Sequence, residues 1–291
     1  MSAPTATLIS AVPVPFTADG DLDSGGLQPL YRYLAAAGVD GVFTAGTTGE
    51  FTALDDDERE TVLTEALEVF GPDRVYAHVG AASARQATRL AARAVALGAR
   101  NLAAITPFYL PAGPAALVDY YRELDAVAGA ARLFVYLYAA RTTTTVTPAQ
   151  LAELAEIPSV VGAKISGEPT ARVLEYIRAA PDGFVVYSGN DVEFGDVLRA
   201  GGAGGVCGAV SVFPRPFTEV ADALRRGDEQ AAAAAQDRVE RAVEAVAGAD
   251  IALIKAGLAL RGLPAGPPRV ALDEPSPAQL DTLRTAIEEL T

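Results

Sequence analysis

The stretch Val160-Val161-Gly162-Ala163-Lys164-Ile165-Ser166-Gly167 combines an apolar, strand-like run with a Ser-Gly turn. A lysine behind such a run is expected at the edge of a buried sheet and not on a solvated helix. Lys164 and Lys255 are the two lysines of the chain, whose other basic residues are arginines. A desolvated lysine amine can lose its proton and attack a carbonyl carbon, which a guanidinium cannot do. The alternative is a strand-end lysine whose ammonium reaches solvent.

Apolar runs of this kind recur along the chain, and most are separated by an amphipathic helical pattern with a glycine or proline stop. Eight runs follow one another at intervals of about 20 to 35 residues, the spacing of right-handed βα crossovers. We therefore expect a (β/α)8 TIM barrel. A doubly wound open sheet is the alternative, although no glycine-rich dinucleotide fingerprint follows the first run. The predicted strands cover residues 8–16, 41–45, 74–79, 101–106, 132–138, 160–165, 183–187 and 204–207.

Beyond Pro216 the pattern contains helices only, at about residues 228–247, 251–260 and 277–290. The sequence predicts two units. Residues 1–222 form the barrel that carries the active site, and residues 223–291 form a C-terminal helical region packed on the barrel.

The composition of the chain limits which classes of protein and which kinds of partner are expected. Half of the 291 residues are hydrophobic and 21% are charged, as in a globular protein with a large core. A net charge of −14 opposes binding to nucleic acid and to anionic membranes. The lone Cys207 cannot form an internal disulfide, and the chain shows neither a charged leader nor a long apolar run, so we expect a cytoplasmic protein. With one histidine, His78, and no metal-type spacing, we expect no metal. Both His78 and Cys207 are predicted to be packed strand residues.

In a TIM barrel the active site lies where the strands end. The second strand leads into Gly46-Thr47-Thr48-Gly49-Glu50, in which glycines bring backbone N–H groups close to a ligand and hydroxyls donate to a carboxylate, although such residues also form plain turns. An amine, phenols and hydroxyls that meet at one edge suit Schiff-base chemistry on a keto acid. The later strand ends supply Thr106-Pro107-Phe108-Tyr109, then Tyr136, Tyr138 and Arg141, and then Lys164.

These motifs stand in the order found in a known family. From about residue 7 to its C-terminus the chain resembles the dihydrodipicolinate synthase and N-acetylneuraminate lyase family of pyruvate-dependent class I aldolases. The resemblance implies that Lys164 forms an imine with pyruvate or with the keto group of the substrate. It also implies that Tyr136 moves protons at the imine carbon, that Thr47 is the relay hydroxyl beside it, and that Thr48 binds the pyruvate carboxylate.

The same resemblance assigns further positions. Gly46, Gly189 and Val206 are expected to line the substrate site. Tyr109 matches a residue that reaches into the neighbouring subunit's site to complete the relay, which implies a homotetramer built as a dimer of dimers. The expected partners are pyruvate and an aldehyde, and no cofactor is expected.

The chain also departs from the family pattern. After Tyr136, Leu137-Tyr138-Ala139-Ala140 replaces the usual Asn, aliphatic residue and Pro. Threonines 142–145 replace the glycine that usually follows the arginine, in the loop that covers the second substrate. Ile165-Ser166-Gly167 stands where the synthases commonly place an acidic residue after the lysine.

Arg141 favours the synthase branch, in which an arginine at this place holds the carboxylate of aspartate semialdehyde. The alternative is an exposed strand-end arginine. Ala82 and Gln86 stand where synthases that are inhibited by lysine have Asn and Glu, so we expect no inhibition by lysine. Lys255 is expected to be a structural or solvated charge on a helix. Glu50 is expected to orient the threonine loop, to act as a cap or to pair with an arginine.

Three functions remain open for a chain with this resemblance. The first is condensation of pyruvate with an aldehyde, as in 4-hydroxy-tetrahydrodipicolinate synthase, or the reverse cleavage. The second is an aldolase or a dehydratase that acts on a 2-keto-3-deoxy sugar acid. The third is a non-catalytic relative that binds a keto acid.

Overall fold

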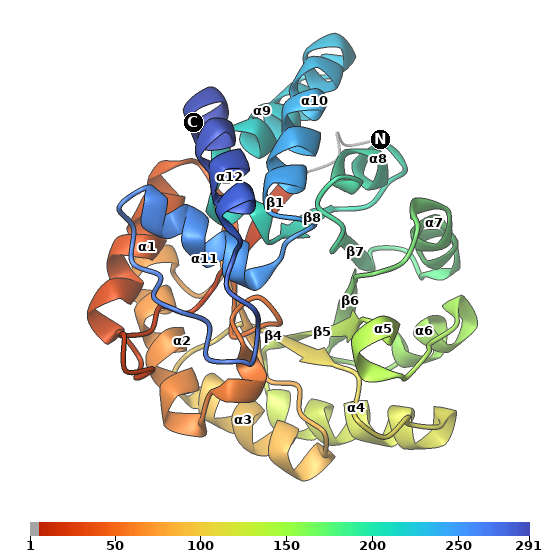
Figure 1. The fold of residues 1–291 in the computed structure, drawn as a ribbon. Coiled ribbons are helices and arrows are strands. Elements are labelled where there is room, and N and C mark those ends of the chain that lie inside the picture. Colours follow the sequence, from red (N-terminus) through yellow and green to blue (C-terminus); the bar gives the residue numbers. More distant parts are fainter. Residues whose placement is uncertain (1–5) are drawn as a thin grey trace.

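A computed structural model describes residues 6–291, so the first five residues of the predicted barrel unit lie outside it. Eight parallel strands form a closed barrel in which each strand pairs with the next and β8 pairs with β1 (Figure 1). The predicted (β/α)8 TIM barrel is confirmed, because in an open sheet the first and last strands, β1 and β8, would not pair with each other. The strands are β1 (Thr7–Ala11), β2 (Gly41–Thr44), β3 (Val75–His78), β4 (Asn101–Ile105), β5 (Arg132–Leu137), β6 (Val160–Ile165), β7 (Val185–Ser188) and β8 (Gly204–Cys207).

Helices surround the strands as an outer ring (Figure 1). Their starts follow local sequence signals, such as the capping box of Asp55 and Glu58 at α2 and the proline at the first position of α6. The helices are α1 (Ser24–Ala36), α2 (Asp56–Phe70), α3 (Ala84–Ala96), α4 (Pro114–Ala128), α5 (Ala139–Thr142), α6 (Pro148–Leu154), α7 (Thr170–Ala179), α8 (Phe194–Arg199), α9 (Pro214–Arg225), α10 (Glu229–Ala245), α11 (Ile251–Leu260) and α12 (Pro277–Leu290), with short 3-10 turns η1 (Phe51–Ala53) and η2 (Ala209–Ser211).

Two predicted strands differ from the observed ones by more than one residue at an end. The first was expected to run to residue 16, but β1 ends at Ala11, and Pro13 and Pro15 follow where the chain leaves the barrel. Proline has no N–H to donate to a neighbouring strand, so the apolar pattern continued beyond the pairing. The seventh was expected from residue 183, but Gly183 has a φ of +83° and belongs to the preceding turn.

Aromatic side chains fill the inside of the barrel, which is therefore a packed core and not a pore. The Tyr76 ring lies 5.1 Å from the Phe134 ring and 5.8 Å from the Tyr187 ring, centroid to centroid. The two tyrosine hydroxyls are 2.9 Å apart, so each buried phenol has a hydrogen-bond partner.

The C-terminal helices pack on one side of the barrel, and the segment between α11 and α12 returns toward η1 and α2 (Figure 1). We call this segment, residues 261–276, the C-terminal strap. The predicted boundary between residues 222 and 223 falls inside α9, and the division into two units stays a prediction. Within residues 6–291, no helix is both long and apolar enough to cross a membrane.

Candidate active site

Lys164 lies near the end of β6 with its side chain directed into the barrel mouth. The residue is only 5% exposed, and its ammonium nitrogen lies 4.4 Å from the ring centre of Phe43 and 4.3 Å from that of Tyr136. Among the described residues, no carboxylate lies within 4.0 Å of this nitrogen. The amine is therefore buried against aromatic rings without a paired counter-charge, as its place behind an apolar strand predicted.

Tyr136 stands beside Lys164 because the two are register partners in β5 and β6. The Tyr136 side chain is buried, and its hydroxyl lies 3.2 Å from the Thr47 hydroxyl, in the loop after β2. Either oxygen can donate in this hydrogen bond. The structure thus brings together an amine, a phenol and a second hydroxyl from three different strand ends, an arrangement through which a proton can move.

The threonine loop, residues 46–50, has a tight backbone. A side chain at Gly46 would place its Cβ 2.7 Å from the Phe43 ring, the same ring that contacts the Lys164 ammonium. Thr47 and Thr48 both face the pocket at the barrel mouth. Gly46 itself is therefore a packing residue that lets the loop approach the site, and its own atoms do not line the pocket.

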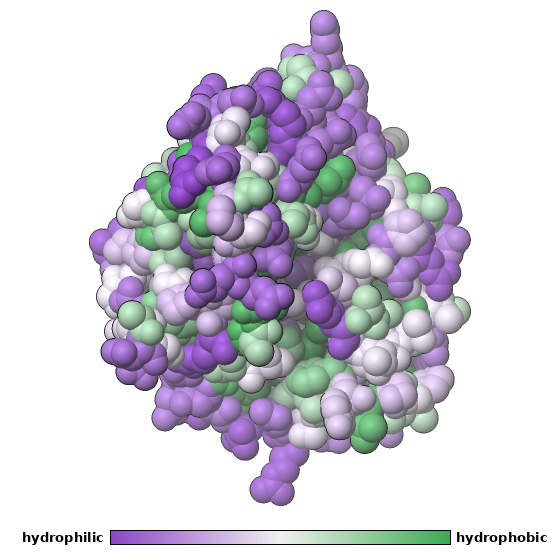
Figure 2. Space-filling model, in the orientation of Figure 1, coloured by the Kyte–Doolittle hydropathy of each residue, from purple (hydrophilic) through white to green (hydrophobic). Residues whose placement is uncertain are grey.

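A pocket of about 410 Å³ opens at the end of the barrel where these residues meet. Figure 2 shows that this face of the molecule is hollowed near its centre. Gly189 lines the pocket where only a glycine fits, because a Cβ there would lie 1.9 Å from the Ser166 hydroxyl and 3.1 Å from Cε of Lys164. Val206 of β8 supplies an apolar part of the wall.

Arg141 lines the pocket from α5, and its guanidinium lies 5.8 Å from the ring centre of Tyr138. Two of the four threonines that follow it, Thr142 and Thr144, are buried and structural. Thr142 is buried and hydrogen-bonded at 3.0 Å to the Thr106 hydroxyl, and the Thr144 hydroxyl donates to the Pro107 carbonyl at 2.9 Å. The departure from the family pattern therefore ties the loop after β5 to the loop after β4.

Tyr109 is not part of this pocket. Its side chain is 88% exposed, and its φ of +75° lies in a region that non-glycine residues rarely adopt. Leu110 beside it is 73% exposed. The role predicted for Tyr109 in a neighbouring subunit's site stays a prediction.

Sequence reasoning missed several residues of the pocket wall. Ser166 could have been predicted from the sequence, because side chains two positions apart in extended backbone face the same side and Lys164 was already placed at the site. Asn190 and Asp191 follow Gly189, and no local pattern marked them. Also missed were residues of the C-terminal region that line the pocket, namely Val243, Ala247, Gly248, Ala249, Asp250, Ile251 and Leu272.

Asp191 is the buried carboxylate of this wall. Its oxygens accept hydrogen bonds from the backbone N–H groups of Gly208 at 3.2 Å and Ala209 at 2.7 Å. Burial raises the pKa of Asp191, and these two N–H groups and the charge of Lys164 act in the opposite direction. Burial, reinforced by the Asp191 charge, raises the pKa of the Cys207 thiol, so Cys207 is the inert buried residue that was predicted.

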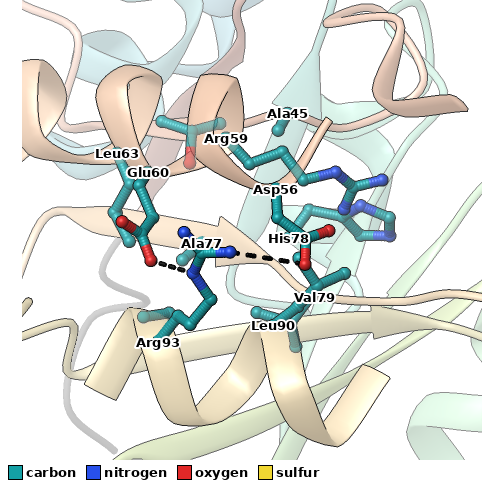
Figure 3. Close-up of a pocket in the computed structure, with 12 residues that line it drawn as sticks. Ala45, Asp56, Arg59, Glu60, Leu63, Ala77, His78, Val79, Leu90 and Arg93 are labelled. Carbon is teal, nitrogen blue, oxygen red and sulfur yellow. Dashed lines mark hydrogen bonds and ion pairs between the residues drawn. The ribbon is translucent and has the colours of Figure 1, made fainter. Parts of the chain in front are cut away.

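His78 is also a packed residue, as predicted. Burial, and next the charge of Arg59, lower the pKa of His78 well below its usual value. Figure 3 shows His78 and Arg59 beside a small cavity between α2 and α3, where Arg93 binds Glu60 and Asp56. The cavity has a volume of about 20 Å³, far too small for a keto acid.

One ion pair decides both the partner of Glu50 and whether Lys255 is a structural or a solvated charge. Glu50 pairs with Lys255 at 2.6 Å and not with an arginine. Lys255 is therefore a structural charge, and the solvated alternative is wrong because its side chain is 1% exposed. Within residues 6–291, no group of three or more His, Cys, Asp or Glu side chains is arranged to hold a metal ion.

Residues 4–290 match the Dihydrodipicolinate synthetase family. The chain belongs to this family. It is 36% identical to 4-hydroxy-tetrahydrodipicolinate synthase 1 of Streptomyces coelicolor over 278 residues, which cover 93% of this chain and 89% of that protein. It is 34% identical to an uncharacterized DapA-like lyase of Halobacterium salinarum over 279 residues, which cover 94% and 91%. The family is one of class I pyruvate aldolases, and the chain is a lyase of this type.

Solved structures agree with the family assignment. YagE, a prophage protein of the dihydrodipicolinic acid synthase family from E. coli K12 solved with pyruvate, superposes with a TM-score of 0.89 at 27% identity and 98% coverage of both chains. The sialic acid aldolase of Ruminococcus gnavus reaches a TM-score of 0.91 at 23% identity, covering 98% of this chain and 97% of its own, which shows a shared fold.

Proposed function

We propose that this lyase joins pyruvate to an aldehyde, or cleaves the corresponding product, through an imine on Lys164. The observation that carries the proposal is the buried, unpaired amine of Lys164, 4.3 Å from the ring centre of a tyrosine whose hydroxyl contacts Thr47. A lysine amine that faces a pocket is the side-chain nucleophile that forms imines with ketones. The pyruvate complex of YagE supports a keto acid as the ligand.

The chemistry follows from these groups. The Lys164 nitrogen attacks the pyruvate carbonyl carbon, the carbinolamine loses water, and an imine forms. The imine withdraws electrons, so a methyl proton leaves and an enamine results, which attacks the aldehyde carbon. We assign the proton transfers to Tyr136 with Thr47, since a phenol alone is a weak base at neutral pH. Water then hydrolyses the new imine and releases Lys164.

Substrate binding is assigned to the pocket wall. Thr48 binds the pyruvate carboxylate through its hydroxyl, Gly189 and Val206 shape the space around the keto acid, and Gly46 lets the loop of Thr48 approach it. No cofactor takes part in this scheme. Tyr109 would complete the relay of a neighbouring subunit in a homotetramer, and its 88% exposure beside exposed Leu110 supports an interface there. We place the enzyme in the cytoplasm, where the lone buried Cys207 stays reduced.

Trapping of the imine tests the proposal directly. After incubation with pyruvate and borohydride, we expect the intact wild-type protein to gain the mass of one reduced pyruvate. The Lys164→Ala variant should gain none. A wild type without adduct would contradict the proposal and favour a non-catalytic relative or a dehydratase that takes a different keto acid.

The second substrate has two candidates. Arg141 suits an aldehyde with a carboxylate, such as aspartate semialdehyde, because a guanidinium binds carboxylates through two parallel hydrogen bonds. A hydroxylated aldehyde, as released from a 2-keto-3-deoxy sugar acid, is favoured by the polar wall of Ser166, Asn190 and Asp191. A dehydratase would turn over such a sugar acid without releasing pyruvate, so detection of free pyruvate distinguishes it from an aldolase.

The Arg141→Ala variant separates the two aldehydes. If the carboxylated aldehyde is the substrate, its KM should rise about 10- to 100-fold, the effect of losing a charged hydrogen bond. The pyruvate concentration for half-maximal trapping should change little. An equal loss of affinity for pyruvate would place Arg141 at the pyruvate end of the pocket instead. No change in the affinity for either substrate would favour the hydroxylated aldehyde.

A further inference from the structure

An ion pair without solvent contact lies behind the threonine loop. The Glu50 and Lys255 side chains are 0% and 1% exposed, and Glu50 Oε1 lies 2.6 Å from the Lys255 ammonium. Glu50 ends the loop that carries Thr47 and Thr48, whereas Lys255 belongs to α11 of the C-terminal region. The proposed mechanism uses neither residue, although a buried charge pair is costly to form unless its geometry is good.

Each member of the pair is also bound to the C-terminal strap. Glu50 Oε2 accepts hydrogen bonds from the backbone N–H groups of Arg269 at 2.6 Å and Val270 at 2.8 Å. The Lys255 ammonium donates to the Pro267 carbonyl at 3.0 Å. The contacts of the Glu50 carboxylate with Lys255, Arg269 and Val270 are therefore all with residues that are distant in the sequence.

Arg269 extends this contact to the start of α2. Its guanidinium binds both carboxylate oxygens of Glu58, at 2.7 and 2.8 Å, and donates to the Ala53 carbonyl at 2.8 Å. Arg269 and Lys255 also lie over the same ring, each 4.1 Å from the centre of Phe16. The segment from the threonine loop to α2 is thus held along its length by the strap.

The backbone of Glu50 shows why such support matters. Its φ of +54° lies in the left-handed region, where a residue with a side chain is strained. Its N–H donates to the Thr47 carbonyl at 3.0 Å, so the conformation of Glu50 determines where Thr47 lies. The Thr47 hydroxyl in turn contacts Tyr136 at 3.2 Å. The chain of contacts from Lys255 to the relay is therefore continuous.

We propose that Glu50 and Lys255 are positioning residues, through which the C-terminal region sets the place of Thr47 relative to Tyr136. This inference rests on the proposed function. It gives the C-terminal helices a part in the proton relay, although they supply no acid or base to it. A displacement of about 1 Å at a reacting group can lower a rate by about two orders of magnitude, so small shifts of the loop will be measurable.

Exchange of the pyruvate methyl protons for deuterium in D2O provides the readout, because it requires the imine and the relay but no aldehyde. The exchange rate is divided by the rate of borohydride trapping, which reports imine formation alone. In Lys255→Met and Glu50→Gln we expect this ratio to fall at least about tenfold, in protein shown by circular dichroism to be folded at the assay temperature. Glu50→Gln keeps one oxygen for the strap N–H groups, removes the charge and replaces the oxygen that faces the Lys255 ammonium with an NH2 group.

Arg241→Met is the matched control. It removes an ion pair of 2.7 Å between α10 and α12 that is about half exposed, and the exchange ratio should stay at the wild-type value. A wild-type ratio in folded Lys255→Met or Glu50→Gln would overturn the inference. If Lys255→Met does not fold, Glu50→Gln decides alone. Failure of the proposed function is distinct, because the wild type itself would then neither trap nor exchange pyruvate.

Discussion

Lys164 and Lys255 are both buried, at 5% and 1% exposure, and both lie against aromatic rings. They differ in what else surrounds the ammonium. Lys255 has a carboxylate at 2.6 Å and a backbone carbonyl at 3.0 Å, while Lys164 has a phenol that is hydrogen-bonded to a threonine. Burial lowers the pKa of Lys255, and its bond to Glu50 opposes this shift.

The difference shows that burial alone does not make a lysine reactive. A carboxylate partner stabilises the ammonium form and occupies the nitrogen, which makes Lys255 part of the scaffold. The amine of Lys164 faces an open pocket in which a carbonyl compound can replace the missing partner. In the proposed mechanism the same residue type thus serves as a nucleophile in one region, whereas it is a structural cation in the other.

Removal of the side chain of Lys164 gives the largest expected effect. Lys164→Ala should lose all turnover and all borohydride-trapped adduct. Its melting temperature should stay close to that of the wild type, since the lost side chain lines an existing pocket and leaves no closed cavity. Adduct formation at another lysine would break the comparison, and the remaining candidate would be Lys255.

Tyr136→Phe keeps the ring beside the ammonium and removes only the hydroxyl. We expect methyl-proton exchange or turnover to slow by about 10²- to 10⁴-fold, the scale of a lost acid–base group, while some imine still forms. Exchange kinetics and trapping should be measured on the same preparation. Unchanged exchange would mean that the proton moves through another group.

Ser166→Asp would make the two lysines alike. Its carboxylate would enter the space near Lys164. A Cβ atom added at Gly189 would lie 1.9 Å from the Ser166 hydroxyl and 3.1 Å from Cε of Lys164, so these two side chains border the same small space. An opposite charge at this range stabilises the ammonium, so the trapping rate at neutral pH should fall about 10- to 1000-fold. Ser166→Asn has nearly the same shape and is the control. An equal loss in both variants would indicate crowding and not charge.

His78 extends the comparison to a buried base that stays neutral, and its expected effect is the smallest. Because burial lowers its pKa, the unfolded chain takes up a proton as the pH falls through about 6.5, while the folded chain does not. Stability is therefore lost as the pH falls below this value. Between pH 7.0 and 5.5 the loss should be about 1 kcal/mol in the free energy of unfolding.

Urea unfolding at pH 7.0 and at pH 5.5 measures this loss in the free energy of unfolding. His78→Asn should lack the decrease, whatever its stability at pH 7.0. Since His78 is the single histidine, few other groups titrate in this range. An equal decrease in the variant would assign the pH dependence to the carboxylates.

Much of the fold was predictable because its signals are local. Strand β8 (Gly204–Cys207) and helices α11 (Ile251–Leu260) and α12 (Pro277–Leu290) have the bounds expected from apolar runs, helical period and stop residues. The regular alternation of strands and helices predicted the barrel but left an open sheet as the alternative, and the pairing of β8 with β1 decides in favour of closure. Where the pattern failed, as in residues 12–16, apolar residues continue past the last backbone pairing and only the prolines mark the exit.

The candidate site was predictable in part for the same reason. Tyr136 and Lys164 lie near the ends of their strands and Thr47 follows one, and the carboxyl ends of parallel strands meet at one face. Asp191 and the pocket residues 247–251 could not be placed, because no periodicity marks them and they reach the site through packing of the C-terminal helices.

The sequence by itself determined the order of strands and helices and the residues that end each strand, because these depend on neighbours along the chain. It assigned the imine-forming role to Lys164 and a structural or solvated charge to Lys255, but it could not name the groups that surround either ammonium. Only the tertiary structure decided that Lys255 meets Glu50 and that Lys164 meets no carboxylate among the described residues. The physical reason is that the charge partner of a buried group comes from a distant segment, and folding alone brings the two together.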